Sequence, residues 1–176
     1  MAQYDEALRL DSERQEAHTN MALLLETLGR PSEALEHHRK ALEIAPNTAE
    51  EQLNLGQCLA TLDRSDEALD AFREAIRLAP GKAEPYAAAA KTLCARNGAS
   101  PEDLAEALRL AQKAITNSRR ANTLEIYAQA CAANGDFERA IALTEEALKL
   151  PGSSKIPGFG DRLRAALHTY RSAAQR

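Results

Sequence analysis

The sequence predicts an all-α fold made of antiparallel helical hairpins. Its 176 residues include 36 Ala and 24 Leu but only six Ile, no Val and no Trp. Ala and Leu favour helices, whereas strands favour β-branched and aromatic side chains. Small and apolar residues also recur at an interval of 34 residues, and Gly and Pro stand between the predicted helices. The chain is therefore expected to be a run of similar hairpins.

The 34-residue interval is clearest in the first half of the chain. Ala34, Ala41 and Pro46 recur as Ala68, Ala75 and Pro80. Segment 49–82 carries the fullest pattern, formed by Asn54, Leu55, Gly56, Ala68, Phe72, Ala75 and Pro80. This pattern resembles the tetratricopeptide repeat (TPR), and with the closing helix it is similar to the C-terminal TPR region of bacterial multi-repeat proteins. The resemblance implies a right-handed solenoid, or superhelix, of hairpins with a C-terminal capping helix.

The elements follow in order along one continuous domain, 1–176. We predict the second helix of a truncated repeat at 1–14, TPR units at 15–48, 49–82, 83–120 and 121–152, a loop at 153–160 and a capping helix at 161–175. Asp161 is the expected N-cap of that last helix. Unit 83–120 is divergent because 96–100 lengthens its turn, so its helices are expected to be shifted relative to their neighbours.

The small residues have two expected roles. In the second helix of each repeat, paired alanines should let helices pack closely; these are Ala34, Ala41, Ala68, Ala75, Ala107, Ala114, Ala140 and Ala147. In the first helices of the later repeats, other alanines should lie on the concave surface and leave room for a partner; these are Ala87, Ala88, Ala95, Ala132 and Ala133.

No pattern of residues predicts catalysis. His38 stands at a position that is aromatic in the repeat, and His37 is expected to point outward. Cys58, Cys94 and Cys131 lie far apart without a CxxC pair, so neither a disulfide framework nor a metal site is predicted. Seven aromatic residues provide little lining for a cofactor pocket. The sequence therefore predicts no enzyme, no cofactor and no bound metal.

Charge and hydropathy limit the partners and the compartment. The net charge of -4 gives no reason to expect nucleic acid. The longest bulky apolar run, from Met21 to Leu25, is far shorter than a transmembrane helix, and no basic and apolar leader precedes the first repeat. Three unpaired thiols favour a cytoplasmic location, with a periplasmic domain of a membrane-anchored parent protein as the alternative.

The resemblance implies a peptide-binding groove on the first helices of the repeats. Its predicted residues are Asn20, Asn54, Gln57, Lys91 and Gln129, together with Glu16, Glu50, Glu84 and Glu125. Asn20 and Asn54 stand where related proteins use an asparagine ladder, in which each amide can both donate to and accept from a peptide unit. Glu16, Glu50 and Glu84 recur at one repeat position, where they either form an acidic rim for a basic partner or stabilise the first helical turns through the helix dipole.

The partner is predicted only as an unknown protein or peptide. The clamp that binds chaperone tails in other family members is not expected, because Thr19, Leu23, Glu84 and Ala88 replace its Lys, Asn and Arg positions. The leading prediction is a protein–protein interaction scaffold. The alternative is a regulatory or substrate-docking region of a larger, for example glycosyltransferase-like, enzyme whose catalytic part lies upstream. Self-association through the truncated repeat at 1–14 is a further possibility.

Overall fold

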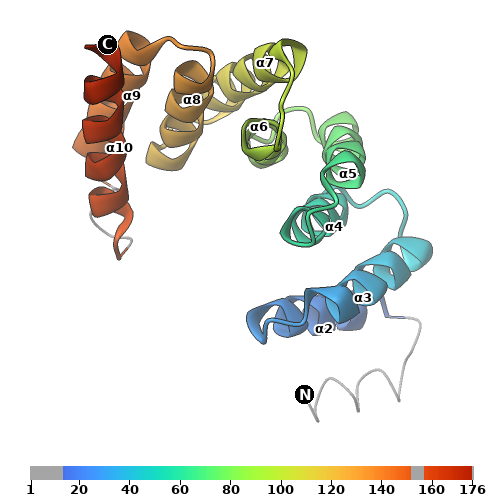
Figure 1. The fold of residues 1–176 in the computed structure, drawn as a ribbon. Coiled ribbons are helices and arrows are strands. Elements are labelled where there is room, and N and C mark those ends of the chain that lie inside the picture. Colours follow the sequence, from blue (N-terminus) through green and yellow to red (C-terminus); the bar gives the residue numbers. More distant parts are fainter. Residues whose placement is uncertain (1–13, 152–156, 176) are drawn as a thin grey trace. The chain divides into compact units, whose positions relative to one another are not determined.

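A computed structural model of the chain describes residues 14–151 and 157–175, and these are almost entirely helical (Figure 1). The helices are α2 (Gln15–Thr27), α3 (Pro31–Ile44), α4 (Ala49–Thr61), α5 (Ser65–Leu78), α6 (Glu84–Ala95), α7 (Pro101–Asn117), α8 (Ala121–Ala133), α9 (Phe137–Lys149) and α10 (Phe159–Ala174). No strand occurs in this part of the chain, which confirms the all-α prediction. The predicted truncated helix at 1–14 lies outside the described residues, apart from Arg14.

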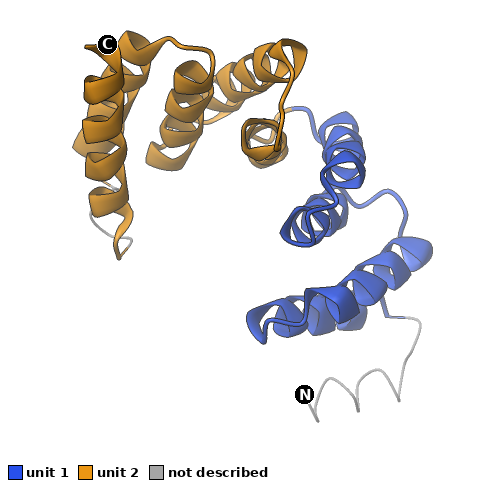
Figure 2. Ribbon diagram, in the orientation of Figure 1, with its two compact units in different colours: residues 1–80 blue, residues 81–176 orange. Residues whose placement is uncertain are grey.

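The helices form two compact units, which we call unit 1 (1–80) and unit 2 (81–176) (Figure 2). In unit 1, α2 packs against α3, α4 packs against α5, and α3 contacts α4. In unit 2, α6 packs against α7 and α8 against α9, while α8 also contacts both α6 and α7. The last helix, α10, packs against α9. Each unit is therefore a stack of helical hairpins, and unit 2 ends in an additional helix.

The paired alanines are completely buried in both units. None of the eight side chains is exposed to solvent; they are Ala34, Ala41, Ala68, Ala75, Ala107, Ala114, Ala140 and Ala147. This confirms that they serve close packing. The expectation that Ala87 lies on an open surface is wrong, because it is only 6% exposed on α6, a helix covered by both α7 and α8.

The turns inside the hairpins contain residues with a left-handed backbone. Gly29 has a φ of 71° between α2 and α3, and Gly135 has a φ of 80° between α8 and α9. Asp63, between α4 and α5, has a φ of 59° and is the only non-glycine residue with positive φ in the described segments. Since Asp63 lies 34 residues after Gly29, one repeat position holds Gly in one hairpin and Asp in the next.

Replacing Asp63 with Gly is therefore expected to stabilise the protein by about 0.5 to 1 kcal/mol, because a side chain disfavours the left-handed conformation. Urea unfolding followed by circular dichroism would measure the change. The same replacement at Asp70, which is exposed within α5, should destabilise the protein because Gly weakens a helix interior. A lower midpoint for Asp63→Gly than for the native protein would contradict the expected strain.

The final helix begins earlier than the sequence analysis predicts. It starts at Phe159, directly after Gly158, whose φ is 72°. Phe159 is only 2% exposed and joins Leu163 in the core of unit 2, so its burial adds residues to the start of the helix. The predicted start at 161 is wrong, and Asp161 lies in the first turn, where it pairs with Arg164 at 2.7 Å. Residues 153–156 of the predicted loop lie outside the described segments.

None of the described helices combines the length and the apolar character that are needed to cross a membrane.

Candidate functional site

A polar surface cavity of about 410 Å³ lies in unit 1, along the N-terminal parts of α2 and α4. We call it the α2–α4 cavity. Its lining residues are Gln15, Glu16, Thr19, Asn20, Thr48, Glu50 and Glu51. The two helices are the first arms of successive hairpins, so the cavity occupies the kind of surface on which the sequence analysis places a groove.

The cavity has an exposed rim and a buried floor. Glu16, Asn20 and Glu50 are exposed and form what we call the rim. Glu51 also lines the cavity but is only 1% exposed, so it forms the floor. Three carboxyl groups therefore border one small space.

The floor residue, Glu51, belongs to a series of polar contacts that leads into the interior of unit 1. The Thr19 hydroxyl donates to Glu51 Oε2 at 2.7 Å, and Glu51 Oε1 lies 2.6 Å from His38 Nδ1. The other ring nitrogen of His38, Nε2, lies 3.4 Å from Glu26 Oε1. His38 is completely buried, so its imidazole lies between two carboxyl groups with no access to bulk water.

Glu51 and His38 occupy repeat positions that hold apolar residues in the neighbouring repeats. The residues 34 positions before and after Glu51 are Ala17 and Pro85, and both are buried. The residue 34 positions after His38 is Phe72, also buried. Two polar residues at packing positions therefore satisfy each other across α3 and α4. Glu51 was not among the residues predicted from the sequence, although its departure from the apolar residues of the neighbouring repeats could have revealed it.

A pair of histidine rings also lies in unit 1. His18 Nδ1 of α2 and His37 Nδ1 of α3 are 2.9 Å apart, and the ring centres are separated by 5.2 Å. Partial burial, followed by the proximity of His18, lowers the pKa of His37. The expectation that His37 points outward is wrong, because α2 provides a ring against which it packs.

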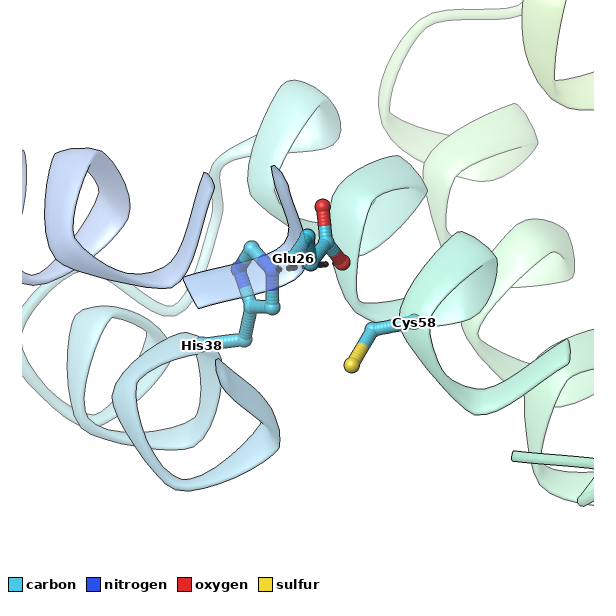
Figure 3. A group of neighbouring side chains, drawn as sticks. All are labelled: Glu26, His38 and Cys58. Atoms are coloured by element: carbon cyan, nitrogen blue, oxygen red, sulfur yellow. Dashed lines mark hydrogen bonds and ion pairs between the residues drawn. The ribbon is translucent and has the colours of Figure 1, made fainter. Parts of the chain in front are cut away.

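Three residues with metal-binding side chains, one of which is His38, lie close together in unit 1. Glu26 of α2, His38 of α3 and Cys58 of α4 point toward one another (Figure 3). Their ligand oxygen, nitrogen and sulfur atoms lie within 4.8 Å of one another. The Cys58 thiol donates to the carbonyl oxygen of Pro31 at 3.2 Å, and burial raises its pKa to about 11. The sequence analysis assigned no metal ligand here, because these residues are far apart along the chain.

Only part of the predicted groove converges on the α2–α4 cavity. Glu16, Asn20 and Glu50 line it together. Asn54 is half-buried and Gln57 is exposed, and both lie later on α4, outside the cavity lining. Gln15, Thr19, Thr48 and Glu51 complete the lining.

The remaining predicted groove residues lie in unit 2. Glu84 and Lys91 are exposed on α6, and Gln129 is half-buried on α8. Glu125 of α8 accepts hydrogen bonds from Arg162 of α10 at 2.7 and 3.1 Å. The Glu125 carboxyl group is therefore engaged by the last helix.

Comparison with protein families identifies the repeat. One tetratricopeptide-repeat model matches residues 13–81, and a second matches residues 99–154. Together the two matches span more than half of the chain. The chain belongs to the tetratricopeptide-repeat family. The fold of this family is a protein-interaction repeat fold.

Solved structures share the architecture of this tetratricopeptide-repeat protein. TTC0263, a TPR protein from Thermus thermophilus, is 20% identical with a TM-score of 0.74, covering 92% of this chain and 91% of its own. YrrB, described as a TPR protein with an unusual peptide-binding site, is 19% identical with a TM-score of 0.68, covering 98% and 87%. MamA is 21% identical with a TM-score of 0.71, covering 83% of each chain. Comparison with curated protein sequences gives no significant match.

Proposed function

We propose that this TPR protein is a non-catalytic scaffold that binds an extended segment of a partner protein in the α2–α4 cavity. The observation that carries this proposal is the convergence of Glu16, Asn20 and Glu50 around one cavity. These residues come from the first helices of two successive hairpins, so a ligand in the cavity would contact both hairpins of unit 1. The description of YrrB as having a peptide-binding site supports a similar use of the fold.

The chemistry of the cavity favours a ligand segment that contains Lys or Arg. Its lining includes three glutamates and no Lys, Arg or His among the described residues. A basic side chain would be attracted to the two exposed carboxylates of the rim, with an energy that salt reduces. The Asn20 amide can donate to and accept from the backbone of the same segment. The cavity thus offers charge selection for a side chain and sequence-independent contact for the backbone.

A peptide array that contains basic, neutral and acidic sequences, followed by fluorescence anisotropy on the hits, would test this function. Basic peptides are expected to bind best, and more weakly at high salt. Asn20→Ala should weaken binding roughly 5- to 30-fold, since the hydrogen bond that its amide donates and the one that it accepts together contribute about 1 to 2 kcal/mol. The Glu16→Gln, Glu50→Gln double variant should reduce the preference for basic over neutral peptides.

The matched control is Glu84→Gln, which changes the same repeat position on α6 without altering the cavity. It should leave both affinity and charge preference unchanged. Equal binding of all hits by the native protein, by Asn20→Ala and by the Glu16→Gln, Glu50→Gln double variant would refute a role for the cavity. If only the asparagine variant lost affinity, the result would support the backbone contacts and contradict the charge selection.

A further inference from the structure

We propose that Glu26, His38 and Cys58 form a binding site for a transition-metal ion of the zinc type. Carboxylate oxygen, imidazole nitrogen and thiolate sulfur are the three donor types that Zn²⁺ takes in proteins. Three such ligands with a fourth position left to water form an open tetrahedral site. The proposal is independent of peptide binding, because none of the three residues lines the α2–α4 cavity.

The distances between the donors suit one small ion. His38 Nε2 and Glu26 Oε1 are 3.4 Å apart. Two ligands bound at about 2.0 to 2.1 Å in tetrahedral geometry are separated by about 3.3 to 3.4 Å. The three ligand atoms lie within 4.8 Å of one another, so the sulfur needs to move by only about 1 Å to complete the site. For this, the Cys58 thiol must release its contact with the Pro31 carbonyl and give up its proton to solvent as it binds the ion.

A second carboxyl group orients the imidazole for metal binding. Glu51 Oε1 lies 2.6 Å from His38 Nδ1, a position in which a carboxylate accepts the Nδ1 proton. In the neutral ring, the lone pair of Nε2 then faces Glu26. A histidine that binds a metal through one nitrogen and donates to a carboxylate through the other is a recurrent arrangement in zinc sites. Glu51 would therefore act as a positioning residue for the metal ligand.

The partial exposure of Glu26 provides an entry path for the ion and for water. His38 and Cys58 are completely buried, whereas the side chain of Glu26 is 29% exposed. An ion can reach the site past Glu26, and a water molecule can occupy the fourth position from the same side. The ligands come from α2, α3 and α4, so a bound ion would connect the two hairpins of unit 1.

Titration of the reduced, chelator-treated full chain with cobalt chloride, and separately with zinc chloride, tests the site. One equivalent of Co²⁺ should produce the absorption of a tetrahedral centre with a thiolate-to-cobalt charge-transfer band, and Zn²⁺ should displace it. Zinc should also raise the unfolding temperature. Cys58→Ala is expected to abolish the charge-transfer band and to weaken zinc binding at least ten-fold, as measured by calorimetry.

Cys131→Ala is the matched control, since Cys131 is also completely buried and lies in unit 2. This variant should retain the band and the affinity. Glu26→Gln, at a partly exposed position, provides a second ligand variant if Cys58→Ala fails to fold, and it should also weaken zinc binding. The proposal is overturned if the native chain gives no one-equivalent cobalt spectrum, or if either ligand variant binds both ions as the native chain does.

Discussion

Replacing Glu51 with Ala is expected to lower the free energy of unfolding by about 3 kcal/mol. Glu51 accepts a hydrogen bond from the Thr19 hydroxyl and contacts the buried His38 imidazole at 2.6 Å. Alanine would remove both acceptor oxygens and leave His38 inside the protein without its closest partner. Urea unfolding monitored by circular dichroism would measure the loss, with the slope of the transition compared between variants to check that the unfolding behaviour is unchanged.

The neighbouring residue provides a sharp control for this prediction. Glu50 carries the same side chain on the same helix turn but is exposed at the cavity rim. Glu50→Ala should change the free energy of unfolding by no more than about 0.5 kcal/mol. The free energy of unfolding of Glu51→Gln, which keeps one acceptor oxygen, should lie between those of Glu50→Ala and Glu51→Ala. Similar stabilities for Glu50→Ala and Glu51→Ala would show that the buried contact with His38 contributes little.

Replacing Gly56 with Ala is expected to destabilise the protein by about 2 kcal/mol, although alanine is the better helix former. Gly56 is buried in α4, and a methyl group at this position would overlap the ring of Phe72 from α5. Phe72 is itself only 1% exposed, so its ring has little room to move away. The steric cost therefore exceeds the gain in helix propensity. Denaturant unfolding would again measure the effect.

Two further variants separate the clash from a general effect of losing glycine. Gly160 also lies in a helix, but a methyl group there would approach only Arg164 Nη1 at 3.6 Å, an ordinary contact. Gly160→Ala should therefore be neutral or stabilising. Combining Gly56→Ala with Phe72→Leu should cost at least about 1 kcal/mol less than the sum of the two single changes, because the smaller side chain relieves the overlap. Simple additivity would contradict the proposed contact.

The hairpin architecture could be predicted because its determinants are local and repeated. A buried alanine seven residues from another marks the packing face of a helix wherever it occurs, as at Ala34 and Ala41. The start of α10 could not be predicted in the same way. It depends on the burial of Phe159 in the core of unit 2, a tertiary contact that overrides the local capping signal of Asp161.

The candidate site was predicted only in part for a related reason. Its exposed rim residues, such as Asn20, fall at family positions and could be identified directly. Glu51 and His38, in contrast, depend on each other: either one alone at its position would lack its closest polar partner in the packing of unit 1. Their contact joins residues 13 positions apart on different helices. Such a pair becomes evident only when both departures from the apolar repeat pattern are considered together.

The division of the α2–α4 cavity into rim and floor limits how its specificity can evolve. The rim residues Glu16, Asn20 and Glu50 are exposed, so substitutions there can change the preferred ligand at little cost to folding. The floor residue Glu51 serves the helix packing as well as the cavity, so a mutation of its charge would have to be accompanied by a change at His38. Descendants of this sequence, or designed libraries based on it, should therefore diversify at the rim, while Glu51 and His38 change together or not at all.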